Sequence, residues 1–154
     1  MSFDAQRDTL RANLMVRKMT NEEMFEKVRE AFVEALGVDD DEVVPGATIF
    51  DDLGAESLDL LEIVYLLEHA FGIKIPRDGV REASREDIDP SDYEVDGKLT
   101  ALAIEKLKEI MPEVPPEEFV EGMSPNDIPR LFRVQTFVNI VARLLEEKAG
   151  NASV

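Results

Sequence analysis

The sequence has no cysteine and a single histidine, His69. Without cysteine there is no disulfide framework, no thiolate metal site and no cysteine nucleophile. One histidine excludes metal sites built from several histidines and weakens any scheme of acid–base catalysis. We therefore expect no metal site and no enzymatic activity from this chain.

Basic residues are also scarce. Lys and Arg number 17 against 34 Asp and Glu, which gives a net charge of −17. This charge opposes binding to nucleic acid and to anionic membranes, and it favours partners with basic patches. No apolar run approaches the ~20 residues that a membrane-spanning helix needs. Charged residues such as Asp4 and Arg7 interrupt any secretory apolar region, so we expect a cytoplasmic protein without membrane insertion.

The chain does contain enough apolar residues for a core, at 44% of 154 residues, and it suits one domain with an appendage. Residues 1–19 differ from the rest, because they hold four basic residues against two acidic ones. They predict an N-terminal extension that is either frayed or folded onto the acidic body or a partner. Residues 20–150 are expected to form the domain, and residues 151–154 a frayed tail.

Capping signals and apolar spacing predict the helices. Thr20 and Glu23 form a capping box, and Gly37 ends the helix that follows them. Gly72 and Gly150 are the corresponding end signals of two later helices. Apolar residues at helical spacing then predict helices over residues 21–36, 57–71, about 100–111 and 132–148, with a shorter one starting near 115–119.

The remaining stretches are expected to be loops. Residues 38–52 form a long loop with apolar anchors, and residues 77–96 are polar enough to predict a mobile loop. Asp96-Gly97 is a turn signal that predicts a very short hairpin between residues 93–95 and 98–100. A further loop is expected over residues 123–129.

Ser57 stands where the second helix is expected to begin, just after Gly54 and Ala55. Backbone N–H groups at a helix start lack partners and favour an anion. Ser57 is thus either a plain N-cap or a site for attaching a phosphate-linked group. A catalytic serine would need a nearby base, but His69 is about 18 Å away along the same helix at 1.5 Å per residue. His69 is expected on the helix surface.

The stretch Asp51 to Pro76, including Asp-Asp-Leu-Gly-Ala-Glu-Ser-Leu-Asp, resembles an acyl carrier protein. The resemblance covers residues 21–76 and resumes at about 133–148, where Arg-Val-Gln-Thr-Phe is similar to the family's last helix. It implies an all-α four-helix bundle. It also implies a covalent 4′-phosphopantetheine arm, which a phosphopantetheinyl transferase takes from coenzyme A and attaches to the serine matched by Ser57. The thiol of the arm would carry acyl groups as thioesters.

The sequence departs from the family's pattern in two places. Glu56 stands where the family usually has Asp, so the charge is kept and the side chain is one methylene longer. Residues 77–131 form a long insert, and some divergent bacterial carriers have a similar segment with a Gly-Lys-Leu-Thr stretch like residues 97–100. We expect a mostly helical inserted subdomain whose helix at 100–111 packs near the last helix. There it would enlarge the acyl pocket or add a docking surface.

The resemblance and the helical spacing together give two sets of candidate site residues. Partner enzymes for acyl loading, condensation and acyl transfer would contact Glu56, Leu58, Asp59, Leu61, Glu62, Tyr65 and Glu68. The acyl chain would lie against Phe50, Ile63, Leu67, Phe71, Ile75 and Phe137, although all six also suit an ordinary core. The expected function is a monomeric acyl carrier in specialised fatty-acid or lipid biosynthesis.

Three alternatives stay open at this point. The chain is also compatible with a carrier-like docking module that is never modified, or with an aminoacyl or peptidyl carrier, although those tend to be less acidic. Asp92, Glu94 and Asp96 have the spacing of half a calcium-binding loop. The twelfth position of that loop should be Glu and is Ala103, so a polar turn is the better interpretation.

Overall fold

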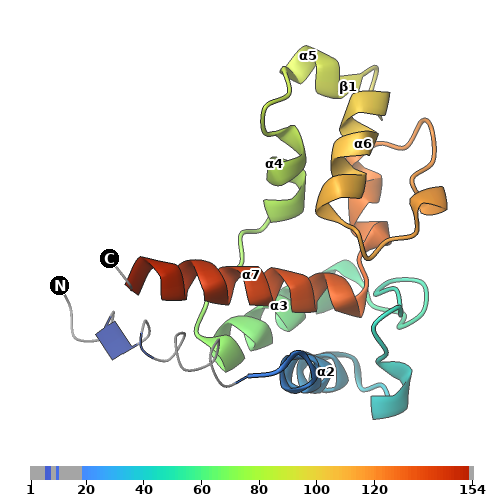
Figure 1. Cartoon of the computed structure of the whole chain (residues 1–154). Coiled ribbons are helices and arrows are strands. Elements are labelled where there is room, and N and C mark those ends of the chain that lie inside the picture. Colours follow the sequence, from blue (N-terminus) through green and yellow to red (C-terminus); the bar gives the residue numbers. More distant parts are fainter. Residues whose placement is uncertain (1–5, 8–9, 11–18, 153–154) are drawn as a thin grey trace.

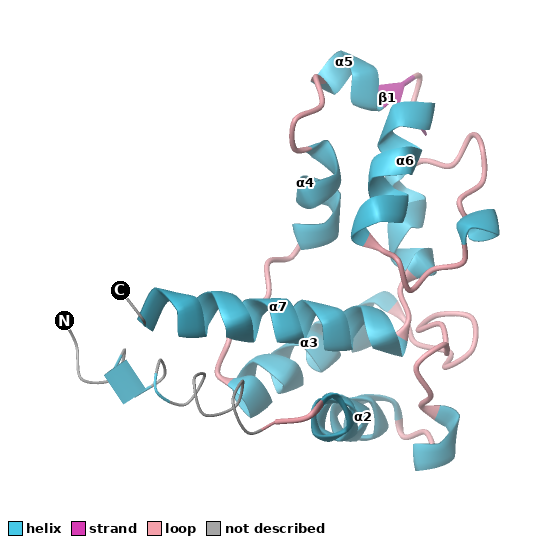
Figure 2. Cartoon of the chain, viewed as in Figure 1, coloured by secondary structure: helices cyan, strands magenta, loops and turns pink. Residues whose placement is uncertain are grey.

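The structure, a computed structural model, describes residues 6–7, 10 and 19–152. It confirms the all-α fold class, because the strands of the described part form only one small hairpin (Figures 1 and 2). The prediction for residues 1–19 lies mostly outside the described residues, as does the end of the predicted tail. The elements are α2 (Asn21–Leu36), η1 (Asp40–Glu42), α3 (Ser57–Phe71), α4 (Gly79–Arg85), α5 (Pro90–Tyr93), β1 (Glu94–Val95), β2 (Lys98–Leu99), α6 (Ala101–Ile110), η2 (Pro116–Glu118), η3 (Pro125–Leu131) and α7 (Val134–Ala152).

Helices α2, α3 and α7 surround a first apolar core, and we call this part the body. The predicted capping box starts α2: the Glu23 N–H donates to Thr20 Oγ1 at 3.1 Å, and the Thr20 N–H donates to the Glu23 carboxylate at 3.3 Å. The rings of Phe32 and Phe137 meet edge to face, with centroids 5.5 Å apart. This contact joins α2 to α7 at the centre of the core.

The loop between α2 and α3 is fastened to the start of α7. The Ile49 N–H donates to the Phe132 carbonyl at 3.0 Å, and the Val134 N–H donates to the Ala47 carbonyl at 3.1 Å. Since these bonds hold Phe132 in extended backbone, α7 begins at Val134 rather than at residue 132 as predicted. The predicted stop at Gly150 is also wrong, because the helix continues through it to Ala152.

The insert, residues 77–131, has a second apolar core of its own and stands above α7 (Figure 1). Helix α6 packs mainly against α4 and α5, so the expectation that it packs near the last helix is wrong. The predicted mobile loop at 77–96 is also wrong. It contains two short helices because Val80, Ile88 and Tyr93 join the second core.

For two further stretches of the insert, the structure confirms one prediction and contradicts the other. The predicted hairpin is confirmed, with Val95 opposite Lys98 and positive φ at both turn residues, Asp96 (52°) and Gly97 (79°). The expected loop at 123–129 is instead the 3₁₀ helix η3, because Ile128 and Leu131 turn inward to the second core.

A few residues connect the two cores. Phe132 packs against both of them. Arg133, which is buried, forms an ion pair with Glu118, and the Thr136 hydroxyl donates to the Glu113 carboxylate at 2.6 Å. The segment after α6 is therefore tied to the first turn of α7. None of the helices in the described part of the chain combines the length and apolar character needed to cross a membrane.

Candidate functional site

The loop before α3 is shaped by two neighbouring residues. The Thr48 N–H donates to the Asp52 carboxylate, and the Asp52 N–H donates to Thr48 Oγ1, each at 2.9 Å. Gly54 then takes a φ of +69°, which L-residues with a side chain rarely adopt, and this turns the chain toward α3. Ala55, which follows, is buried and donates its N–H to the Ile49 carbonyl at 3.0 Å. The chain therefore reaches Ser57 from a closed, hydrogen-bonded loop.

Ser57 is the first helical residue of α3, and the N-cap is Glu56. The interpretation of Ser57 as a plain N-cap is therefore wrong. The Glu56 N–H donates to the Asp59 carboxylate at 2.9 Å, so the acidic pair flanking Ser57 closes the helix start without it. Ser57 is exposed, and its hydroxyl makes no hydrogen bond with any described residue. An exposed hydroxyl that makes no hydrogen bond within the fold is available as the nucleophile that covalent attachment requires.

The surroundings of Ser57 suit a phosphodiester. It lies in the first turn of a 15-residue helix, where unpaired backbone N–H groups and the helix dipole favour negative charge. The carboxylates of Glu56 and Asp59 oppose this effect, but they are engaged at the helix start or exposed to solvent, and the described residues leave the Ser57 hydroxyl open to a phosphate-linked arm. When bound, such an arm supplies a thiol that can hold an acyl group as a thioester.

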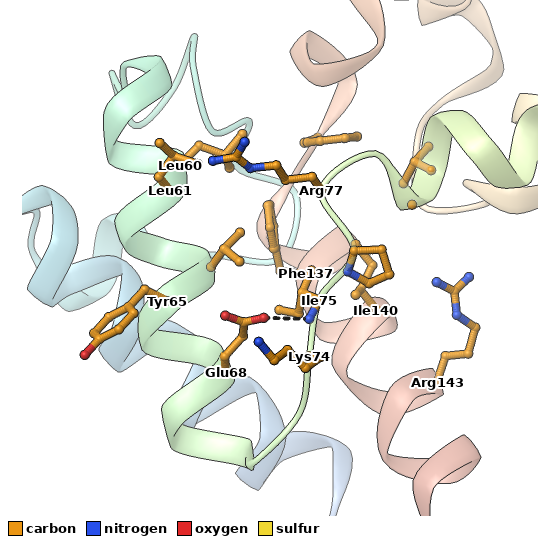
Figure 3. Close-up of a pocket in the computed structure, with 15 residues that line it drawn as sticks. Leu60, Leu61, Tyr65, Glu68, Lys74, Ile75, Arg77, Phe137, Ile140 and Arg143 are labelled. Atoms are coloured by element: carbon orange, nitrogen blue, oxygen red, sulfur yellow. Dashed lines mark hydrogen bonds between the residues drawn. The ribbon is translucent and has the colours of Figure 1, made fainter.

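A cavity of about 470 Å³ lies beside the same helix, between α3, residues 74–80 and α7 (Figure 3). Its size is within the range of small-molecule sites. Most of the lining is apolar, from Leu60, Leu61, Val64, Ile75, Val80, Phe132, Phe137 and Ile140. Polar atoms come from Glu68 and from the cations Lys74, Arg77 and Arg143. The cavity therefore suits a mainly apolar chain.

The structure separates the six residues predicted to line an acyl pocket. Ile75 and Phe137 line this cavity. Ile63, Leu67 and Phe71 are almost fully buried within the first core, and Phe50 is half-buried against it. Helical spacing could not distinguish a core position from a cavity wall, because both are apolar. The residues it missed, Val80, Phe132 and Ile140, come from elements whose contacts only the fold determines.

The seven predicted partner-binding residues fall into two groups. Leu58, Leu61 and Tyr65 expose 76%, 47% and 58% of their surface, and Glu56 and Glu62 are also exposed. Exposed large apolar side chains beside acidic groups are what a docking partner can cover. The carboxylates of Asp59 and Glu68 instead accept backbone N–H groups of this chain, from Glu56 and Ile75.

Two other features of the sequence lie away from Ser57. His69 is exposed near the far end of α3, where its ring lies 4.4 Å from the ring of Tyr65, centroid to centroid. Asp92 belongs to α5, and Asp96 forms the hairpin turn. No group of three or more acidic, histidine or cysteine side chains that could hold a metal occurs in the described part of the chain.

The Asp52 carboxyl group, in the loop before Ser57, has a pKa that depends on the hydrogen bonds that close this loop. Hydrogen bonds from the Thr48 backbone N–H and the Thr48 side chain lower the pKa of Asp52, and Arg133 adds a weaker attraction. Because the pKa of Asp52 is lower in the folded state, its charged carboxylate stabilises the fold at pH values above the unfolded pKa of about 4. This stabilisation is lost as the pH falls through the folded pKa.

We predict that Thr48→Val raises the pKa of Asp52 toward its ordinary value of 3.8, because the replaced hydroxyl no longer favours the charged form. An NMR titration of the side-chain carboxyl carbons measures this. Asp89 is the internal control, since Ser91 lowers its pKa within the insert, away from Thr48. An unchanged Asp52 titration in the variant would contradict the described loop.

Comparison with known proteins identifies the class to which this fold and site belong. The family model for the phosphopantetheine attachment site matches residues 26–80. An acyl carrier protein of Zymomonas mobilis is 47% identical over 57 residues, which are 37% of this chain and 73% of that protein. An acyl carrier protein of Guillardia theta is 46% identical over 66 residues, which are 43% of this chain and 82% of that protein. No solved structure matches.

The chain therefore belongs to the acyl carrier protein family. Its prosthetic group is a covalently attached 4′-phosphopantetheine. Proteins of this family are carriers rather than enzymes, and they act with phosphopantetheinyl transferases and acyl-handling enzymes. The match to the family model ends at residue 80, so almost all of the insert lies outside it.

Proposed function

We propose that this protein carries acyl groups on an arm attached to Ser57. The observation that carries the proposal is the exposed Ser57 hydroxyl, which starts α3 and bonds to no described residue while Glu56 serves as N-cap. The family match at residues 26–80 includes this serine. A phosphodiester here gains roughly 0.3–1 kcal/mol from the helix dipole. The first turn of α3 can thus accept the charge that attachment adds.

The cargo we propose is an acyl chain of specialised fatty-acid or lipid biosynthesis. The cavity beside α3 begins at Leu60 and Leu61, about one helical turn from Ser57, and its walls are mainly apolar. Each buried CH₂ group contributes about 0.8 kcal/mol, so even a few carbons favour the sheltered state. An aminoacyl cargo would place its ammonium group in a cavity lined by three cations, Lys74, Arg77 and Arg143, against the single carboxylate of Glu68, which disfavours it.

The partners we propose are enzymes with a small apolar depression surrounded by basic residues. Leu58, Leu61 and Tyr65 supply the exposed apolar contacts, and Glu56 and Glu62 supply negative charge beside them. Charge pairs at such a rim raise the association rate more than the affinity. That suits a monomeric carrier that must leave each enzyme after one step.

The test is the intact mass of the apo protein after incubation with coenzyme A, Mg²⁺ and a broad-specificity phosphopantetheinyl transferase. We expect a gain of one 4′-phosphopantetheine group and one new reactive thiol. Peptide mapping should place the added mass on the segment that contains Ser57. A protein that gains no mass while remaining folded would instead be an unmodified docking module, and the proposed function would be wrong.

A further inference from the structure

The segment that leads from α3 into the insert runs back along α3 toward its N-terminal end (Figure 3). Two charged side chains of the body hold it there. Lys148 Nζ donates to the Gly72 carbonyl at 2.5 Å, and the Ile75 N–H donates to the Glu68 carboxylate at 2.8 Å. This path brings Arg77, the first residue of the insert, beside Leu60 and Leu61.

Leu60 and Leu61 mark the face of α3 on which Ser57 lies. Residues three and four positions apart on an α-helix are neighbours on its surface. The Leu60 and Leu61 side chains lean back toward Ser57, because side chains on an α-helix tilt toward its N-terminus, and Figure 3 shows the Arg77 guanidinium group beside these two leucines. A group attached to Ser57 Oγ thus begins about one helical turn from residues that line a cavity together with Arg77.

A second arginine, Arg81, lines a cavity together with Arg77. This smaller cavity, of about 220 Å³, lies between Leu60 and the insert residues around Ile128. Arg81 donates from Nη2 to Asn126 Oδ1 at 3.2 Å, but its Nε is buried and has no hydrogen-bond partner. Neither arginine forms an ion pair with any residue that the structure describes.

These two cations are unusual in a chain with a net charge of −17, where acidic groups are abundant. A buried N–H donor without an acceptor is costly, and a guanidinium group without a carboxylate partner is suited to a phosphate. Asp78 also lines the smaller cavity but forms no ion pair with either arginine among the described residues, so both arginines still lack an anionic acceptor. The nearest anion that the proposed function supplies is the phosphodiester on Ser57.

We propose that Arg77, together with Arg81 in the adjoining cavity, binds the phosphodiester that joins the arm to Ser57 and directs the arm along the 470 Å³ cavity. This inference rests on the attachment at Ser57. It gives the insert a function at the site: its first residues hold the arm against the body. Partner enzymes must then displace the arm from Arg77 before they can reach the thioester.

The test compares the holo protein with its Arg77→Gln and Arg81→Gln variants, and with Arg130→Gln as control. Arg130 is an exposed insert residue that lines neither cavity. The readouts are the ³¹P NMR shift of the arm and the rate at which its thiol reacts with a water-soluble disulfide. We expect Arg77→Gln to change the ³¹P shift and to raise the thiol rate about two- to fivefold, the size of effect typical of an exposed ion pair. Arg130→Gln should match the unsubstituted holo protein.

A second measurement separates the arm from free phosphate. The Arg77 side-chain Nε–H signal should shift between apo and holo protein, and inorganic phosphate added to Ser57→Ala should move it far less. Equal ³¹P shifts and thiol rates in Arg77→Gln and the unsubstituted holo protein would overturn the proposal. So would an Arg77 signal that responds to phosphate but not to the arm. Failure to form any holo protein would instead contradict the attachment at Ser57.

Discussion

Ser57→Ala is expected to abolish the mass gain from coenzyme A completely. The alanine side chain has no oxygen to form the phosphodiester bond, and the described geometry offers no second hydroxyl at the start of α3. The fold should be unaffected, because the Ser57 hydroxyl bonds to no described residue and alanine favours helix. We expect the free energy of unfolding to change by less than about 0.5 kcal/mol. Intact mass and urea unfolding measure the two results.

Ser91→Ala is the matched control for this experiment. Ser91 is also exposed in the first turn of a helix, α5, but it belongs to the insert and its hydroxyl donates to Asp89 at 2.9 Å. This variant should be loaded as fully as the unsubstituted protein. Loading of Ser57→Ala, or loss of loading in Ser91→Ala, would move the attachment site away from α3.

Phe32→Ala is expected to give the largest loss of stability in the body. Phe32 is fully buried and meets Phe137 edge to face. Removing such a ring costs about 3–5 kcal/mol, because the cavity left behind closes only partly. The whole free energy of unfolding of a domain of this kind is only about 5–15 kcal/mol. Urea unfolding followed by circular dichroism should therefore show a much lower midpoint.

Leu107→Ala is the counterpart in the second core, where Leu107 is also fully buried. This substitution should lower the free energy of unfolding of the insert by about 2–5 kcal/mol. Amide exchange should then rise in α4 and α6 while α2 and α3 stay protected, and Ser57 should still accept the arm. If Leu107→Ala exposes the amides of both cores equally, they unfold as one unit, and their separation would be wrong.

The elements that sequence predicted best are those that local chemistry determines. The capping box of Thr20 and Glu23 places the start of α2, and Gly72 ends α3 with a φ of 65°. Asp96-Gly97 forms the predicted hairpin turn. In each case the signal and its consequence lie within a few residues, so no distant contact can change the outcome.

Predictions failed where distant contacts decide the structure. Residues 77–96 are polar, and only the burial of Val80, Ile88 and Tyr93 in the second core makes helices of them. The packing partner of α6 does not follow from its sequence for the same reason, since an apolar stripe specifies that a helix is buried but not which element covers it. The start of α7 depends on the bonds from the loop before α3.

The sequence by itself determined the class of protein, the helix that begins at Ser57 and the exposed groups beside it. These follow from residue type and spacing along one helix. Only the tertiary structure decided that Glu68 anchors the segment leading to Arg77. It also formed the cavity, whose walls come from three separate parts of the chain. Packing brings these residues together, and a linear pattern holds no information about which distant surfaces will meet.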